Sequence, residues 1–161
     1  MKLPRMLLAD DPRRALGVRP ANAIDETTYA LWVCTTNLGA TASAAGDPTL
    51  PHCLVDVRDG AGRRVRAVSL SRRGVGPEPM PDVPSRRCES PPVPVTEVEL
   101  RRFDAALRRC ADAGYAWGER DCCSCIERAF AEGLERAAPA ALSRAAATLA
   151  AVPDPWLRRA R

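Results

Sequence analysis

The sequence predicts an α+β fold, a small antiparallel sheet packed against two or three helices. Two segments of the first half, 29–36 and 52–58, are rich in β-branched and alternating apolar residues, which is typical of strands. A capping signal at Thr96 and apolar residues at helical spacing after it indicate a helical second half. A chain of 161 residues has the usual size of one domain, so we expect 1–161 to fold as a unit.

The β half is expected at 26–73. Strands are predicted at 29–36, 52–58 and 64–71, and the sequence Asp-Gly-Ala-Gly at 59–62 is typical of a hairpin turn. Alternation along the second strand separates its side chains into two faces. One face carries His52, Leu54, Asp56 and Arg58, and the other carries Cys53, Val55 and Val57.

Two stretches are expected to lack regular structure. Residues 1–25 are interrupted by prolines and form an irregular N-terminal arm with one short helical turn at 11–16. Residues 74–95 hold seven prolines and no periodicity, which predicts a long extended connection. A lid over a groove and a surface for a partner both remain open as its role.

The helical half is expected at 96–152. Thr96 and Glu99 form a capping box that starts the first helix, and Gly114 ends it. The other two helices are expected at 122–131 and 139–151, followed by a loosely held tail at 153–161.

Composition excludes some classes of partner. The net charge of +4 comes from arginine pairs scattered along the chain, so we expect no nucleic-acid partner. No segment approaches the roughly 18 apolar residues that a membrane span requires. The first residues do not have the pattern of a Sec signal, which predicts cytoplasmic synthesis, with export by another route left open.

Seven cysteines are an odd number for a disulfide framework, and their spacing is irregular. We therefore expect mostly reduced thiols. Cysteine packs well as a small apolar group, and this is the role expected for four of the seven. These are Cys34, Cys53, Cys88 and Cys110.

The cysteines at 122 and 123 stand apart because a helix begins there. Asp121 is suited to cap that helix, which places Cys122 and Cys123 in its first turn. The positive end of a helix dipole favours the thiolate, the nucleophilic form of cysteine. Either thiol is a candidate nucleophile, and first-turn N–H groups could bind an oxyanion.

A cysteine nucleophile needs a base, and His52 is the only histidine of the chain. We predict that the fold brings His52 to Cys122. The group that orients the imidazole stays open. Asp56 shares a strand face with His52 but lies roughly 13 Å along the strand; the other candidates are Ser69, Ser71 and Asp121.

This order of a histidine strand, a hairpin and a helix that opens with cysteine resembles the circularly permuted papain-like hydrolases of the NlpC/P60 superfamily. The resemblance covers 29–135. It rests on an aromatic connector, an acidic residue before cysteine, and later Ala-Phe and Gly-Leu pairs. The matching residues are Tyr115, Trp117, Asp121, Cys122, Ala129, Phe130, Gly133 and Leu134, with Pro51 and His52 upstream. Asp121 departs from the commoner asparagine, and Cys123 is an additional cysteine.

The resemblance implies a bacterial cysteine hydrolase of amidase or peptidase type that needs no cofactor and no metal. Its substrate would carry an amide or related acyl bond, with peptidoglycan peptides as one class, and an exported antibacterial effector is one setting for such an enzyme.

Three other interpretations compete. The cysteines could be structural in a non-enzymatic adaptor or partner-binding domain. The C-x-x-C spacing of Cys122 and Cys125 also fits a thiol-redox site, although the preceding strand of a thioredoxin-type unit is missing. Zinc could use these two cysteines with Cys110, Cys88 or His52, but no second ligand pair follows.

Overall fold

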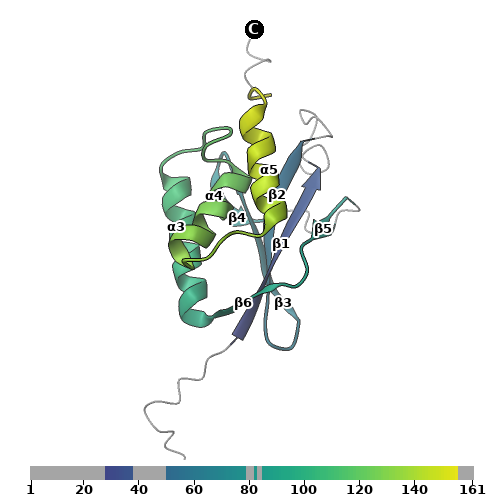
Figure 1. The fold of residues 1–161 in the computed structure, drawn as a ribbon. Helices are drawn as coiled ribbons and strands as arrows, with labels where there is room; N and C mark the ends of the chain where they lie inside the picture. Colours follow the sequence, from purple (N-terminus) through teal and green to yellow (C-terminus); the bar gives the residue numbers. More distant parts are fainter. Residues whose placement is uncertain (1–27, 38–49, 79–81, 83–84, 156–161) are drawn as a thin grey trace, which may run out of the picture.

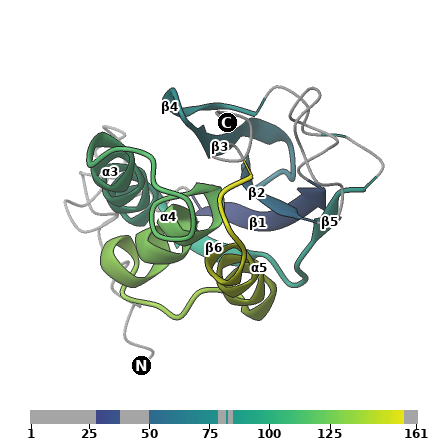
Figure 2. The same ribbon diagram turned by 90° about the horizontal axis from the view of Figure 1, so that it is seen from above.

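The computed structural model describes residues 28–37, 50–78, 82 and 85–155. It has an antiparallel sheet of six strands with helices packed on one face, so the predicted α+β class is confirmed (Figures 1 and 2). The strands are β1 (Thr28–Asn37), β2 (Pro51–Arg58), β3 (Arg64–Ser71), β4 (Gly74–Pro77), β5 (Arg87–Cys88) and β6 (Val93–Thr96). The helices are α3 (Glu97–Asp112), α4 (Cys122–Arg128), a π-helical turn η1 (Ala129–Gly133) and α5 (Ala140–Ala151).

The strand order is β4-β3-β2-β1-β5, and β6 pairs with the other end of β1. The predicted strands at 29–36, 52–58 and 64–71 correspond to β1, β2 and β3. The predicted hairpin turn between β2 and β3 is stabilised by Asp59, whose Oδ1 accepts the N–H groups of Ala61 and Arg63 at 2.9 and 3.0 Å. β1 and β2 pair from Ala30–Arg58 to Asn37–Pro51, and His52 lies at the start of β2.

The proline-rich stretch 74–95 was expected to lack regular structure, but its described parts include three short strands that join the sheet. β4 lies beside β3, and the short β5 and β6 both pair with β1. Prolines are tolerated there because edge positions do not need every backbone N–H for the ladder. Residues 1–25, including the helical turn expected at 11–16, lie outside the described residues.

Both signals that were predicted to bound the first helix, the capping box at Thr96 and the glycine at 114, are present at the ends of α3. The Thr96 hydroxyl accepts the N–H of Glu99 at 3.1 Å, and the Glu99 carboxylate accepts the N–H of Thr96 at 2.8 Å. The first helix ends before Gly114, whose φ of 90° suits glycine. No helix among the described residues has the length and apolar character that a membrane crossing requires.

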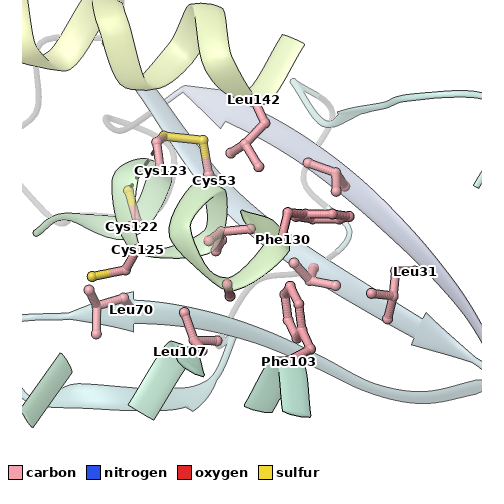
Figure 3. Packing of buried hydrophobic residues seen from close by; sticks show 14 of the residues in the cluster. Leu31, Cys53, Leu70, Phe103, Leu107, Cys122, Cys123, Cys125, Phe130 and Leu142 are labelled. Carbon is pink, nitrogen blue, oxygen red and sulfur yellow. Dashed lines mark hydrogen bonds between the residues drawn. A yellow bond between two sulfur atoms is a disulfide. The ribbon is translucent and has the colours of Figure 1, made fainter. Parts of the chain in front are cut away.

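The main core lies between the sheet and the helices. Val55 and Val57 of β2 point into it, as the predicted alternation requires, whereas Leu54 packs on the opposite face with Cys34. Phe103 of α3 and Phe130 of η1 meet edge to face, with ring centroids 5.4 Å apart (Figure 3). α4 is thereby buried between α3, α5 and β2.

The expectation of mostly reduced thiols is wrong for this structure, in which six of the seven cysteines form three disulfides. The bonds join Cys34 to Cys88, Cys53 to Cys123 and Cys110 to Cys125. Irregular spacing in the sequence gave no sign of them, because each bond joins elements that only the fold brings together. Cys122 is the one free cysteine, and all seven cysteines lie in described segments.

Candidate active site

Asp121 caps α4 as predicted. Its Oδ1 accepts the N–H groups of Cys123 and Ser124 at 3.0 and 2.9 Å, and its Oδ2 accepts that of Gly118 at 2.8 Å. The Ser124 hydroxyl completes the box by accepting the N–H of Asp121 at 2.9 Å. The carboxylate is thus committed to backbone groups, and the N–H of Cys122 is the one in this turn that it leaves uncapped.

Cys122 and His52 come together, although 70 positions separate them in the chain. Cys122 is close enough to the His52 imidazole for its side chain to raise the pKa of the ring through hydrogen bonding and charge. His52 is the second residue of strand β2, and Cys122 is the first residue of helix α4. Cys122 is 3% exposed and His52 8% exposed, so the pair is shielded from solvent.

Glu78 is the third member of the group, and sequence reasoning missed it. Its Oε2 lies 2.8 Å from Nε2 of His52, and its side chain is 1% exposed. This contact occupies Nε2 and leaves Nδ1 as the ring nitrogen available to Cys122. The only signal in the sequence was an acidic residue between Pro77 and Pro79, in a stretch without periodicity.

The protonation of His52 follows from these neighbours. Burial of the ring lowers the pKa of His52, but the hydrogen bonds to Cys122 and Glu78, together with their negative charge, outweigh burial and raise it to about 10. The imidazole is therefore cationic at neutral pH.

The structure removes Cys123 as the alternative nucleophile. Its sulfur is bonded to that of Cys53, so in this oxidised state it is not a thiol (Figure 3). Cys122 Sγ lies 3.9 Å from Cys123 Sγ and is not bonded to it.

Asp56 does not orient His52. Its carboxylate is fully buried and accepts hydrogen bonds from Arg58, Arg64 and Arg86 at 2.6 to 3.3 Å. Burial opposes its ionisation, but the three guanidinium groups hold the pKa of Asp56 below its usual value. Asp56 is the centre of a structural ion-pair cluster, which its place in the strand could not reveal.

Two polar residues close to the pair complete its surroundings. Thr36 of β1 lies directly opposite His52 in the register of β1 and β2 and is 3% exposed. Within the described part of the chain its hydroxyl has no hydrogen-bond partner. Tyr115, from the aromatic connector, lies near Cys122, and burial together with the negative charge of Cys122 raises the pKa of Tyr115.

The residues proposed for a redox or zinc site are not brought together as free thiols. Cys125 is bonded to Cys110 and Cys88 to Cys34, so Cys122 has no C-x-x-C partner in this state. One trio, Asp121, Cys122 and Cys123, has its ligand atoms within 4.8 Å of one another. Its carboxylate already accepts backbone N–H groups and one of its sulfurs is in a disulfide, so these residues do not fit a metal.

Comparison with protein-family models finds no match for this chain, and neither curated proteins nor solved structures match it.

Proposed function

We propose that this chain is a cysteine hydrolase of amidase or peptidase type, with a papain-like site in permuted order. The observation that carries the proposal is the chain of contacts from Cys122 through His52 to Glu78. A nucleophile, an acid-base group and an orienting carboxylate in this order are the parts that acyl transfer requires.

In the proposed reaction the Cys122 thiolate attacks the carbonyl carbon of an amide, and a C–S bond forms. The His52 imidazolium then gives its proton to the leaving nitrogen as the C–N bond breaks. Water replaces the amine, neutral His52 takes a proton from it, and the resulting hydroxide breaks the C–S bond. The acid product leaves, and thiolate and imidazolium are restored without a cofactor.

Glu78 and the start of α4 supply the supporting groups. Glu78 fixes the ring of His52 and stabilises its positive charge through the contact at Nε2. The N–H of Cys122 is the first-turn donor available to a developing oxyanion, because Asp121 occupies the N–H of Cys123. Among the first-turn N–H groups, that of Cys122 is therefore the proposed oxyanion donor.

The three disulfides bear on where such an enzyme would work. Disulfides persist in oxidising compartments and are rare in the cytosol, which favours function outside the cytoplasm after export. Peptides of the bacterial cell wall are amide-bearing substrates found there, and we propose them as the substrate class.

One observation favours a second candidate, a partner-binding domain with a structural thiol. Cys122 is only 3% exposed, as a packed thiol would be. In the hydrolase, a substrate must displace a covering group to reach the sulfur, whereas in the partner-binding domain the thiol stays inert.

The two candidates are separated with p-nitrophenyl acetate, a small activated ester. The hydrolase predicts release of p-nitrophenol with an acetyl group on Cys122, detected by mass spectrometry, and loss of both signals in Cys122→Ser. A wild-type protein that is not acetylated at Cys122 would exclude the hydrolase and leave the partner-binding domain.

A further inference from the structure

The two reactive residues are each one peptide bond away from the same disulfide. Cys53 directly follows His52, and Cys123 directly follows Cys122. The bond between Cys53 and Cys123 therefore joins the chain neighbour of the imidazole to the chain neighbour of the thiol.

This disulfide is also the covalent link between β2 and α4. The second bond from α4 runs from Cys125 to Cys110 of α3, and the third, between Cys34 and Cys88, joins β1 to β5. Neither of these bonds reaches His52 or its neighbours in the chain. All seven cysteines lie in described segments, so no other cysteine can make the link.

From this arrangement we infer that Cys53 and Cys123 are positioning residues: their disulfide holds Cys122 against His52, and the reactivity of Cys122 depends on that bond being intact. The inference rests on the proposed function, since it concerns the same pair. A dithiol reductant would break the S–S bond, leave two thiols at 53 and 123, and itself become a disulfide. With the bond open, the first turn of α4 is tied to the sheet only by noncovalent packing.

The reactivity of Cys122 would then depend on whether the surrounding compartment is reducing or oxidising. Where thiols are kept reduced, the Cys122 thiolate would lose the imidazolium that stabilises it, and Cys122 would react as an ordinary cysteine. Where disulfides persist, the pair would be assembled. A hydrolase with this property would be inactive where it is synthesised and active after export.

Other charged groups face the pair. Asp121 accepts the backbone N–H of Cys123, a contact that substitution of the Cys123 side chain leaves in place. Glu78 follows β4, Asp121 is fixed by the backbone of its own turn, and Tyr115 lies in the connector before α4. Tyr115 also has Arg72 over its ring, with Asp154 bound to Arg72. A change in the pH dependence of Cys122 after loss of the disulfide would therefore report the position of Cys122 relative to His52.

The test compares three variants, each of which lacks one disulfide. Cys53→Ala with Cys123→Ala removes the proposed positioning bond. Cys110→Ala with Cys125→Ala loosens the same helix without touching β2, and Cys34→Ala with Cys88→Ala is the control away from α4. The rate of alkylation of Cys122 by iodoacetamide is measured from about pH 5 to pH 9, and circular dichroism monitors folding. Trypsin releases the modified residue in peptide 121–128, where tandem mass spectrometry assigns the site.

We expect wild type and both control variants to be alkylated rapidly below pH 7. The variant without Cys53 and Cys123 should lose at least about tenfold in rate at pH 6.5, and its rate should rise only toward the ordinary thiol pKa of about 8.5. If it folds and keeps the wild-type profile, the inference is overturned.

Two further outcomes are decisive. If the double alanine variant unfolds, Cys53→Val with Cys123→Ala, which refills part of the lost volume, is measured in its place. If both of these variants unfold while the two control variants fold, the disulfide is a stability element and the positioning role is rejected. If wild-type Cys122 is itself unreactive below pH 7, the proposed function fails. If wild-type Cys122 is reactive and the variant without Cys53 and Cys123 keeps the same alkylation profile, only the positioning role of the disulfide is rejected and the proposed function stands.

Discussion

Nε2 of His52 lies 2.8 Å from Oε2 of Glu78 in a contact that is almost closed to solvent. It connects the start of β2 to the residue that follows β4, and β3 lies between these two strands in the sheet. Cys122 and Glu78 both raise the pKa of the ring. In the proposed reaction, the charge of His52 is the property on which the chemistry depends.

Glu78→Gln tests the carboxylate while keeping a hydrogen-bonding side chain of the same size. Loss of the negative charge should lower the pKa of His52 and remove the carboxylate that fixes its ring. Alkylation of Cys122 by iodoacetamide at pH 7 should slow by about tenfold, because a less well oriented imidazole supports the reacting sulfur less. Glu89→Gln, away from the site, is the control, and equal rates in wild type and Glu78→Gln would refute a role for the carboxylate.

Thr36→Val tests the buried hydroxyl opposite His52. Because this hydroxyl has no hydrogen-bond partner among the described residues, its removal should not lower the free energy of unfolding by more than about 1 kcal/mol. If the hydroxyl also contacts the acyl substrate, acetylation of Cys122 by p-nitrophenyl acetate should be about tenfold slower in Thr36→Val than in the wild type. Thr36→Ser keeps the hydroxyl and should retain the wild-type rate. A loss of stability without a change in acetylation would assign Thr36 a purely structural role.

Asp56→Asn tests the ion-pair cluster on the sheet face opposite the helices. Removing this fully buried negative charge leaves three guanidinium groups without their shared carboxylate partner. We therefore expect the free energy of unfolding to fall by about 3 kcal/mol. Asp82→Asn, at an exposed carboxylate of the same cluster, should cost much less, because solvent screens that carboxylate. Chemical denaturation of both variants supplies the comparison, and similar losses for the two would show that the buried position has no special weight.

The same cluster gives a pH dependence with a defined sign. The pKa of Asp56 is lowered from its ordinary value of 3.8, so its contribution to stability is complete above that pH. The contribution is lost as the pH falls through the lower value of the folded state. The difference in unfolding free energy between wild type and Asp56→Asn should therefore narrow below about pH 3.8; a difference that stays constant there would contradict the assignment.

Local signals in the sequence predicted much of the fold. Alternation along β2, the capping box at Thr96 and the cap at Asp121 depend on neighbouring residues, and each is present in the structure. The meeting of Cys122 with His52 was also predicted, because a nucleophile at a helix start and a single histidine left few other pairings.

The remaining features depend on contacts between distant segments. Glu78 reaches His52 only because β4 folds back beside β3, and nothing in a proline-rich stretch indicates that pairing. The disulfides were missed for the same reason: Cys53 and Cys123 are 70 residues apart, and their irregular spacing reveals neither partner. Asp56 was considered for its strand face, but its three arginine partners come from different places in the chain.

The most direct test of the account is an NMR titration of the His52 imidazole, which is unambiguous because the chain has one histidine. In the oxidised wild type, the ring should remain protonated through neutral pH and release its proton near pH 10. In Cys122→Ser, which removes the thiolate, the midpoint should fall toward the ordinary value of 6.5. A wild-type midpoint near 6.5 that is unchanged in Cys122→Ser would contradict the paired thiolate and imidazolium.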